Sequence, residues 1–274
     1  MGSGIETIEI KRWDDLEENV FRDWWPELNR HRTKRVFRGL TESAFALSTT
    51  LQRMGGSSRE LEPKLLRQFK KYAHQDVTNC RSDWHWLTLA QHHGLPTRFL
   101  DWTNSPFVGL HFATADWPSS RTDGALWALD FTEVKQLLPN TLRNRLDDLG
   151  VKVFTTEELA DVAPSLPVLE ELSKKELNNQ DFMIVFEPPS LDGRIVNQYA
   201  ALTAMSRAET DTGGWLDGQE KIVCQKLIIP HCLKPEIRER LDMINITERV
   251  LFPGLDGLSV WLKRYYGPKW PART

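Results

Sequence analysis

Side chains that take part in enzyme chemistry are concentrated in one stretch of the sequence, residues 89–107. It contains two adjacent histidines, His92 and His93, and then Arg98 and Asp101. Imidazoles and carboxylates are the usual general acids and bases of enzymes, and a guanidinium can bind an anion through two parallel hydrogen bonds. The residue types in this stretch therefore predict a functional site.

Glycine and proline divide this stretch into three elements. Gly94 is expected to end a helix, because glycine tolerates the left-handed conformation that a helix C-terminus requires. Pro96 disfavours the helical conformation at Leu95, so the chain should become extended there. Ser105 and Pro106 are expected to start a second helix, as its cap and its first residue. The polar side chains then lie at the ends of elements, where sites are usually built.

Each candidate side chain has a functional and a structural interpretation. Arg38 is expected to end a strand just before Gly39, where it binds a diphosphate or a carboxylate, or else forms an ordinary salt bridge. His93 either donates to a ligand or holds the turn, and for His92 we favour the structural role. Asp101 either binds a ribose or takes part in the chemistry, or else caps the helix that starts four residues later.

Alternation along the extended segment separates its side chains into two sets. Thr97, Phe99 and Asp101 should share one face, because strand residues alternate with a period of two. Arg98 then points to the other face, where we expect it to pair with a buried acid. Trp102 either stacks on a base or, as is more usual for tryptophan, packs in the core.

Hydrophobic periodicity predicts a chain in which helices come first and strands mixed with helices follow. We expect strands at 7–10, 35–39, 124–130, 182–186, 194–204 and 223–229. We expect helices at 13–24, 59–77, 83–93, 105–114, 235–243 and 256–266. Residues 131–180, rich in Leu, Glu, Asp and Lys, should form short helices inserted into the fold. This order predicts an α+β protein, organised as a single domain over residues 5–274.

Composition places the chain among ordinary globular proteins. Of its 274 residues 40% are hydrophobic and 27% charged, and the formal net charge is −3, so nothing global predicts nucleic-acid or acidic-membrane binding. Three cysteines without metal-ligand spacing, and no signal peptide or long apolar span, lead us to expect a cytoplasmic protein without a metal. We find no phosphate-binding glycine loop and no nucleophile elbow. A nuclease using His92, His93 and Asp101 is conceivable, although no carboxylate cluster for magnesium accompanies them.

The sequence resembles the FRG domain, a family of bacterial and phage-related proteins named for a Phe-Arg-Gly triplet. The resemblance is carried by Phe37-Arg38-Gly39 and by the blocks at residues 91–98, 100–103 and 105–106. Later blocks, at 194–198 and 251–258, extend it over about 36–266. It implies a distant similarity to the ADP-ribosyltransferases, with a split β-sheet core, N-terminal helices and a helical insertion.

That similarity implies roles for individual residues. In ADP-ribosyltransferases a residue on the first core strand holds NAD, and a late strand presents a glutamate in the sequence Asn-Glu-Tyr. In this sequence Asn197-Gln198-Tyr199 resembles that motif, so a neutral glutamine replaces the carboxylate. The resemblance implies NAD as the substrate, with binding residues Arg38, Thr97 and Trp102 and catalytic residues Asp101, Gln198 and His93.

Two classes of function remain open from the sequence. The first is an NAD-dependent ADP-ribosyltransferase-like enzyme or NAD glycohydrolase, acting as a toxin or in phage defence on a nucleic acid, a protein or water. The second is a non-catalytic module of the same fold that binds a nucleotide or a partner, such as a defence-system component or an antitoxin. The polar residues at 89–107 favour the first class, and the replaced glutamate favours the second.

Overall fold

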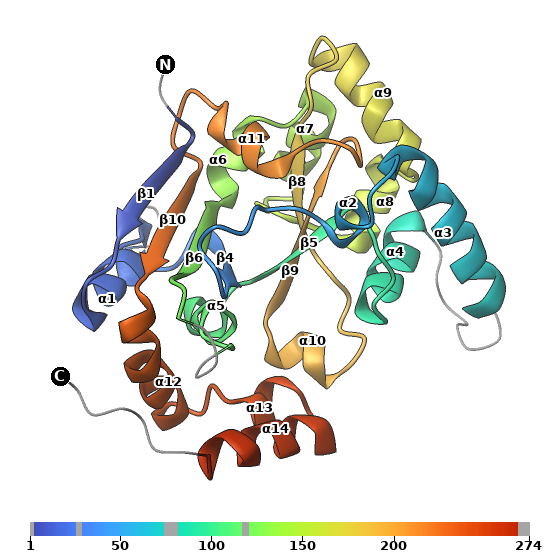
Figure 1. Cartoon of the computed structure of the whole chain (residues 1–274). Helices are drawn as coiled ribbons and strands as arrows, with labels where there is room; N and C mark the ends of the chain where they lie inside the picture. The colour runs from blue at the N-terminus through green and yellow to red at the C-terminus, as the bar shows by residue number, and fades with distance from the viewer. Residues whose placement is uncertain (1–2, 26–28, 74–81, 117–120, 268–274) are drawn as a thin grey trace.

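Eight of the strands form one mixed sheet that runs through the centre of the protein (Figure 1). The computed structural model describes residues 3–25, 29–73, 82–116 and 121–267. The strands follow the order β1-β10-β6-β4-β5-β9-β8-β7. Their bounds are β1 Ile5–Glu9, β4 Arg35–Leu40, β5 Phe99–Thr103, β6 Gly124–Asp130, β7 Phe154–Thr155, β8 Met183–Glu187, β9 Ala200–Met205 and β10 Cys224–Ile229. A separate two-stranded sheet pairs β2 (Trp24–Trp25) with β3 (Arg30–His31).

The central sheet separates in the middle, between β4 and β5. These antiparallel neighbours share one registered residue pair, Phe37 with Thr103. By contrast, β4 pairs with β6 over six residues and β5 with β9 over five. Two four-stranded halves therefore meet at a single point and diverge beyond it, and Arg38 and Asp101 lie next to that point.

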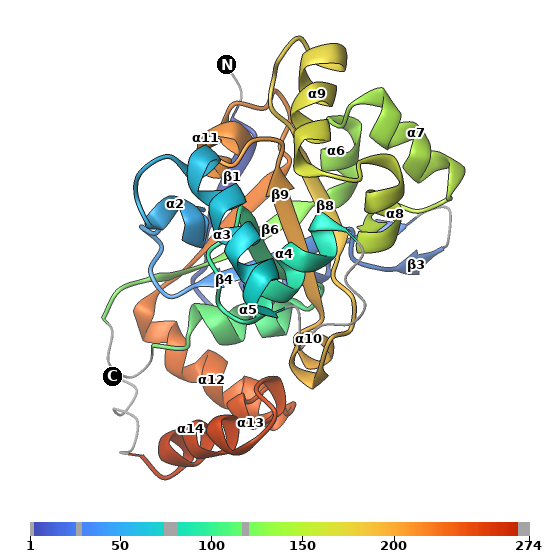
Figure 2. The same cartoon turned by 90° about the vertical axis from the view of Figure 1, so that its right-hand side faces the viewer.

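Helices cover both faces of the sheet (Figures 1 and 2). Those of the N-terminal part and the centre are α1 Trp13–Phe21, α2 Thr50–Arg53, α3 Ser58–Ala73, α4 Asp83–His92 and α5 Pro106–Ala113. The next are α6 Phe131–Gln136, α7 Asn140–Asp148, α8 Thr156–Val162, α9 Leu166–Glu176, α10 Gly193–Asn197 and α11 Thr212–Asp217. The C-terminal part adds a short 3₁₀ turn, His231–Leu233, and α12 Lys234–Met243, α13 Glu248–Leu251 and α14 Leu255–Tyr265.

Three apolar clusters form the core, and one of them contains residues from both halves of the sheet. One packs α1, α5 and α12 against β4, β6 and β10, and a second packs α3, α4 and the helices α7 to α9 against β5, β8 and β9. A third continues along both halves, with α6 and α11. Alternation along β5 shows the arrangement: Phe99 belongs to the second cluster, whereas Leu100 and Trp102 belong to the third.

The α+β class and most expected elements are confirmed, with one correction that matters for the site. The strand expected over 194–204 is wrong in its first half, because residues 193–197 form α10 and the strand β9 begins only at Ala200. Asp192 caps this short helix by accepting hydrogen bonds from the backbone N–H groups of Arg194 and Ile195. The inserted region contains helices α6 to α9 and also the two-residue strand β7. The expected end of the 59–77 helix lies outside the described residues.

Helix α5 lies directly on β4 because both carry a glycine where they cross. A Cβ at Gly39 would lie 1.9 Å from the Gly109 carbonyl oxygen and 2.4 Å from the Ala113 nitrogen, both backbone atoms. A Cβ at Gly109 would instead meet Leu126 Cδ1 at 2.6 Å, the far end of a side chain. The close approach of α5 to the strand that carries Arg38 therefore depends on Gly39 more than on Gly109.

We expect Gly39→Ala to lower the free energy of unfolding by about 1–3 kcal/mol, because the added methyl must push apart two backbones. Gly109→Ala should cost less, since Leu126 can turn away and alanine favours a helix over glycine by roughly 0.5–1 kcal/mol. Urea denaturation of both variants measures this difference. Equal losses in the two variants would contradict the proposed asymmetry.

A buried charged cluster joins α5 to the C-terminal helices. Arg238 on α12 donates from Nη1 to His111 Nδ1 at 2.9 Å and also forms an ion pair with Glu248. Arg264 on α14 donates to Glu248 and to Asp242. Burial, reinforced by the positive charge of Arg238, lowers the pKa of His111 to about 3. Burial alone would raise the pKa of Glu248, but the hydrogen bonds from Arg264 and the charge of Arg238 outweigh it and hold that pKa at about 2.

These shifts predict that acidification weakens the fold. His111 stays neutral in the folded state and takes up a proton near pH 6.5 in the unfolded state. The free energy of unfolding therefore falls as the pH drops below 6.5, and it continues to fall until about pH 3. At pH 5 this amounts to about 2 kcal/mol. Asn at position 111 can accept the bond from Arg238 and does not titrate, so His111→Asn should lose this part of the pH dependence between pH 7 and 5. Denaturation curves at several pH values compare the two proteins, and identical pH dependence would contradict the prediction.

Candidate functional site

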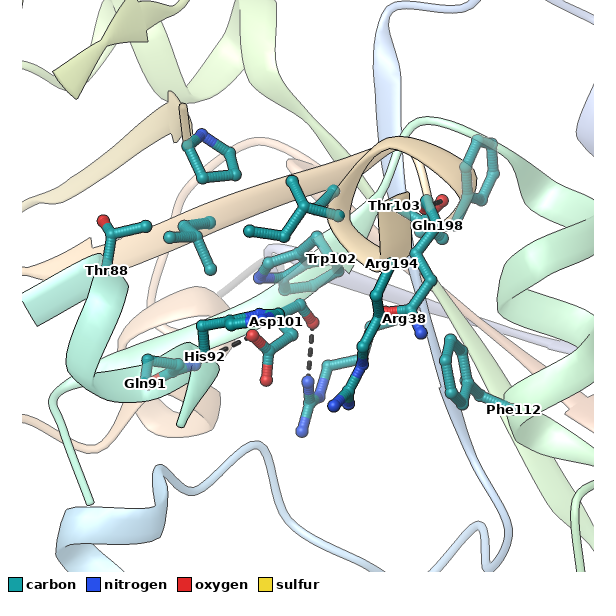
Figure 3. Close-up of a pocket in the computed structure, with 16 residues that line it drawn as sticks. Arg38, Thr88, Gln91, His92, Asp101, Trp102, Thr103, Phe112, Arg194 and Gln198 are labelled. Atoms are coloured by element: carbon teal, nitrogen blue, oxygen red, sulfur yellow. Dashed lines mark hydrogen bonds between the residues drawn. The ribbon is translucent and has the colours of Figure 1, made fainter. Parts of the chain in front are cut away.

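A cavity of about 270 Å³ opens where β4 and β5 separate (Figure 3). Its walls come from five parts of the chain: strand β4, helix α4, strand β5, helix α5 and the segment from Pro188 through α10 into β9. Polar side chains on its wall are Arg38, Thr88, Gln91, His92, Asp101, Thr103, Arg194 and Gln198. Arg38, two residues before the end of β4 and not at its end as expected, therefore shares one cavity with Asp101 of β5 and with Gln198, which follows about 160 residues later in the sequence.

Arg38 bridges the gap between the two halves of the sheet. Its Nη1 donates to the backbone carbonyl of Asp101 at 2.6 Å, while its Nε is buried without a hydrogen-bond acceptor among the described residues. Burial lowers the pKa of this guanidinium, the Asp101 carboxylate acts in the opposite direction, and the nearby charge of Arg53 lowers the pKa further. No carboxylate among the described residues lies within ion-pair distance of the Arg38 guanidinium. The salt bridge that the sequence suggested as the alternative role of Arg38 is therefore not observed.

Asp101 is the only carboxylate among the described residues that line the cavity. Gln91 Nε2 donates to its Oδ1 at 2.9 Å, and Gln91 Oε1 in turn accepts from the hydroxyl of Thr97. The amide of Gln91 is therefore held at both ends, and it fixes one oxygen of Asp101 (Figure 3). The cap of α5 is supplied by Ser105 and not by Asp101. Asp101 is thus available to a ligand through its second oxygen.

Gln198 reaches the cavity from the turn that follows α10, and not from a strand. Its Nε2 donates to the carbonyl of Leu251 at 3.0 Å, and its backbone carbonyl accepts from the Thr103 hydroxyl at 2.7 Å. The next residue, Tyr199, has a φ of 48°, a left-handed conformation that ends the helix and starts β9. This bond uses one of the two amide N–H groups of Gln198, so the second N–H and the amide oxygen remain for a ligand.

The remaining predicted site residues lie in different places. Trp102 contributes to the cavity wall but is 3% exposed, and its indole donates to Thr203, so it belongs mainly to the core. His92 lines the cavity and pairs with Asp192 at 2.8 Å, in agreement with a structural role. His93 is exposed and does not line the cavity, and Thr97 is fully buried behind Gln91. Neither therefore contacts a ligand in this cavity directly.

Four polar lining residues were not singled out as site residues from the sequence: Thr88, Gln91, Thr103 and Arg194. Gln91 precedes the two histidines in the central stretch, so its position there was a usable signal. Arg194 belongs to the late block at 194–198, but the expected strand suggested no particular role for it. Thr88 is buried, with a hydroxyl that has no partner among the described residues, and no sequence signal marks such a position.

Two further searches cover the described residues only. They contain no group of three or more His, Cys, Asp or Glu side chains arranged to hold a metal ion. None of their helices is long and apolar enough to cross a bilayer.

Comparison with known proteins identifies one family. No curated protein and no solved structure matches the chain. The family model of the FRG domain matches residues 33–122, which run from just before β4 to beyond α5 and include Arg38, Gln91 and Asp101. The blocks at 194–198 and 251–258 lie outside this match. Residues 33–122, about a third of the chain, therefore form a match to the FRG domain family.

Proposed function

We propose that the cavity binds NAD and that the protein cleaves the bond between nicotinamide and ribose, as an ADP-ribosyltransferase-like enzyme or an NAD glycohydrolase. One observation carries this proposal: an arginine with unused donors lies beside Asp101, the single lining carboxylate among the described residues, where the sheet separates. NAD cleavage uses two such groups, a cation that binds the diphosphate and an anion that stabilises the positive charge on the ribose.

Asp101 is the group that we assign to the chemical step. As the C1′–N bond breaks, its electron pair goes to the nicotinamide nitrogen and the ribose acquires positive charge. A carboxylate nearby stabilises that charge, and such electrostatic stabilisation is typically worth about 3–4 kcal/mol. Water or an acceptor group then bonds to C1′ and loses a proton. The Gln198 amide oxygen is available to accept from a ribose hydroxyl, which orients the sugar without adding charge.

The size of the cavity favours one end of the dinucleotide. Its 270 Å³ lies just below the roughly 300–1,000 Å³ of pockets that enclose a whole drug-sized ligand. Nicotinamide and its ribose fit such a space, with the diphosphate at the arginine end and the adenosine extending outside. The apolar wall formed by Trp102, Phe112 and Leu202 suits the nicotinamide ring.

A second candidate function is favoured by Gln198. In the resemblance to the ADP-ribosyltransferases this neutral side chain takes the position of a glutamate, and its amide donates to the Leu251 carbonyl. A non-catalytic module would bind a nucleotide through Arg38 and hold it without cleavage. In either case the resemblance to bacterial and phage-related proteins supports a role in defence or as a toxin, with a macromolecular acceptor or an antitoxin as the partner.

Release of free nicotinamide distinguishes the two candidates. Purified protein is incubated with NAD, with and without a cell lysate as a source of acceptors, and nicotinamide is quantified while NAD binding is measured by calorimetry. Release without lysate indicates a glycohydrolase, and release only with lysate indicates a transferase. Binding without release in both conditions supports the non-catalytic module, and the absence of both binding and release contradicts the proposed function.

A further inference from the structure

Arg194 is a second cation of the cavity that none of the roles above uses. It lies in the first turn of α10 and lines the cavity together with Arg38 (Figure 3). Like Arg38, it has no carboxylate within ion-pair distance in the described part of the chain. Asp101 is the one carboxylate among the described lining residues, so the two arginines make the charge of this wall positive, which favours an anionic ligand.

The Arg194 guanidinium is held by an aromatic ring in a way that leaves its donors free. Its Cζ lies 5.3 Å from the ring centroid of Phe252, and that ring packs edge-on against Phe112, which also lines the cavity. A cation–π contact uses the flat face of a guanidinium. The N–H groups lie in the plane of the guanidinium, so they remain available for a planar, two-point contact with a phosphate.

We propose that Arg38 and Arg194 form the two sides of a diphosphate-binding site. This inference rests on the proposed function in taking the ligand to be a dinucleotide, and it adds the residue that completes the grip on its diphosphate. Arg38 contributes a guanidinium fixed by the Asp101 carbonyl, with Nε buried and without an acceptor. Arg194 contributes the second guanidinium from the other side of the split sheet.

The second half of this site is built by residues outside the family match. Helix α10 is held at its start by the pair of Asp192 with His92, and at its end by Asn197 and Gln198, which donate to the carbonyls of Val250 and Leu251. Helix α13 and the following Phe252 therefore position Arg194. Residues 33–122 contain Arg38 but not these elements, so the diphosphate site requires the C-terminal part of the chain.

Binding of inorganic pyrophosphate to the full chain tests the inference without any need for NAD cleavage. Isothermal titration calorimetry compares the wild type with Arg194→Ala, Arg194→Lys and Phe252→Leu. Arg249→Ala is the matched control, because Arg249 stacks on Trp261 at 4.7 Å in the same manner but does not line this cavity. We expect Arg194→Ala to weaken pyrophosphate binding about tenfold or more, the loss of a charge-assisted contact, and Arg249→Ala to leave it unchanged.

Two further variants distinguish a specific two-point contact by the Arg194 guanidinium from the effect of its positive charge alone. Arg194→Lys keeps the charge but loses the fork, so its affinity should lie between those of the wild type and Arg194→Ala. Phe252→Leu should weaken binding by releasing the guanidinium. Wild-type affinity in Arg194→Ala, equal losses in Arg194→Ala and Arg249→Ala, or no pyrophosphate binding by the wild type would each overturn the inference.

The same proteins show which of the two proposals fails. If pyrophosphate binding depends on Arg194 but no nicotinamide is released from NAD, the diphosphate site is supported and the proposed enzymatic function is contradicted. Cleavage of NAD by Arg194→Ala at the wild-type rate and with the wild-type KM overturns the role of Arg194 and leaves the enzyme intact.

Discussion

An Asp101→Asn variant is expected to bind NAD almost as the wild type does, yet to release nicotinamide more slowly by about 10²–10³-fold. Asparagine keeps the shape of the side chain, and its oxygen can still accept from Gln91, so the geometry of the cavity is retained. Only the negative charge is lost, and with it the stabilisation of the cationic ribose, about 3–4 kcal/mol. Steady-state kinetics should therefore show a fall in kcat with little change in KM.

Two comparison variants isolate the charge of Asp101. Asp211→Asn removes an equal charge from the exposed cap of α11, where asparagine also caps well, and should leave kcat unchanged. Gln198→Ala should weaken activity less than Asp101→Asn, since the amide has no charge to lose. Full activity in Asp101→Asn would remove Asp101 from the mechanism, provided that its unfolding curve matches that of the wild type.

Replacement of Arg98 by alanine is expected to lower the free energy of unfolding by about 3–5 kcal/mol. The guanidinium donates from Nε to both oxygens of Glu62, at 3.0 and 2.8 Å, and its Nη1 donates to the Ser206 carbonyl at 3.1 Å. The side chains of the two charged residues are 6% and 2% exposed. Alanine at position 98 would leave the buried carboxylate of Glu62 without its partner. Removing one charge of a buried pair destabilises a protein more than removing both.

A double variant and an exposed pair serve as controls for Arg98. Removal of both charges, in Arg98→Met combined with Glu62→Met, should recover much of the loss, because no buried charge is left alone. Lys175→Ala breaks the exposed pair with Glu171 and should leave the free energy of unfolding almost unchanged, because solvent screens the two charges. Chemical denaturation measures all of these proteins. A loss below about 1 kcal/mol in Arg98→Ala would show that Glu62 finds other partners.

Local features of the chain could be predicted from the sequence, because they depend on neighbours within a few residues. Gly94 has a φ of 84° and ends α4, and Ser105 caps α5 with Pro106 in the first turn, as expected. The predicted pairing of Arg98 with a buried acid is confirmed by Glu62, because alternation along the strand turned Arg98 away from Asp101. The sequence did not identify the acid itself, which lies 36 residues earlier.

The late segment shows where a periodic pattern misleads. Residues 194–204 alternate well enough to suggest one strand, but Asp192 and Gly193 start a helix, and Tyr199 turns the chain in a left-handed conformation. An aspartate before glycine was a usable signal for that helix cap. The role of Arg194 had no such signal, because it depends on Phe252, a residue 58 positions later, and on the helix α13 that precedes it.

The sequence by itself determined which residues carry charge and where helices and strands change, and it placed Arg38 and Asp101 on extended segments. Its expectation that both lie at the ends of their strands is wrong, because β4 continues to Leu40 and Asp101 is the central residue of β5. Only the tertiary structure decided that β4 and β5 share a single residue pair, so that a cavity opens between them. It also decided that Gln91, held by Thr97, fixes Asp101, and that α10 brings a second arginine to the wall. The physical reason is that these features depend on how closely separate elements pack, as α5 packs on Gly39, and distances between elements are set by the whole core.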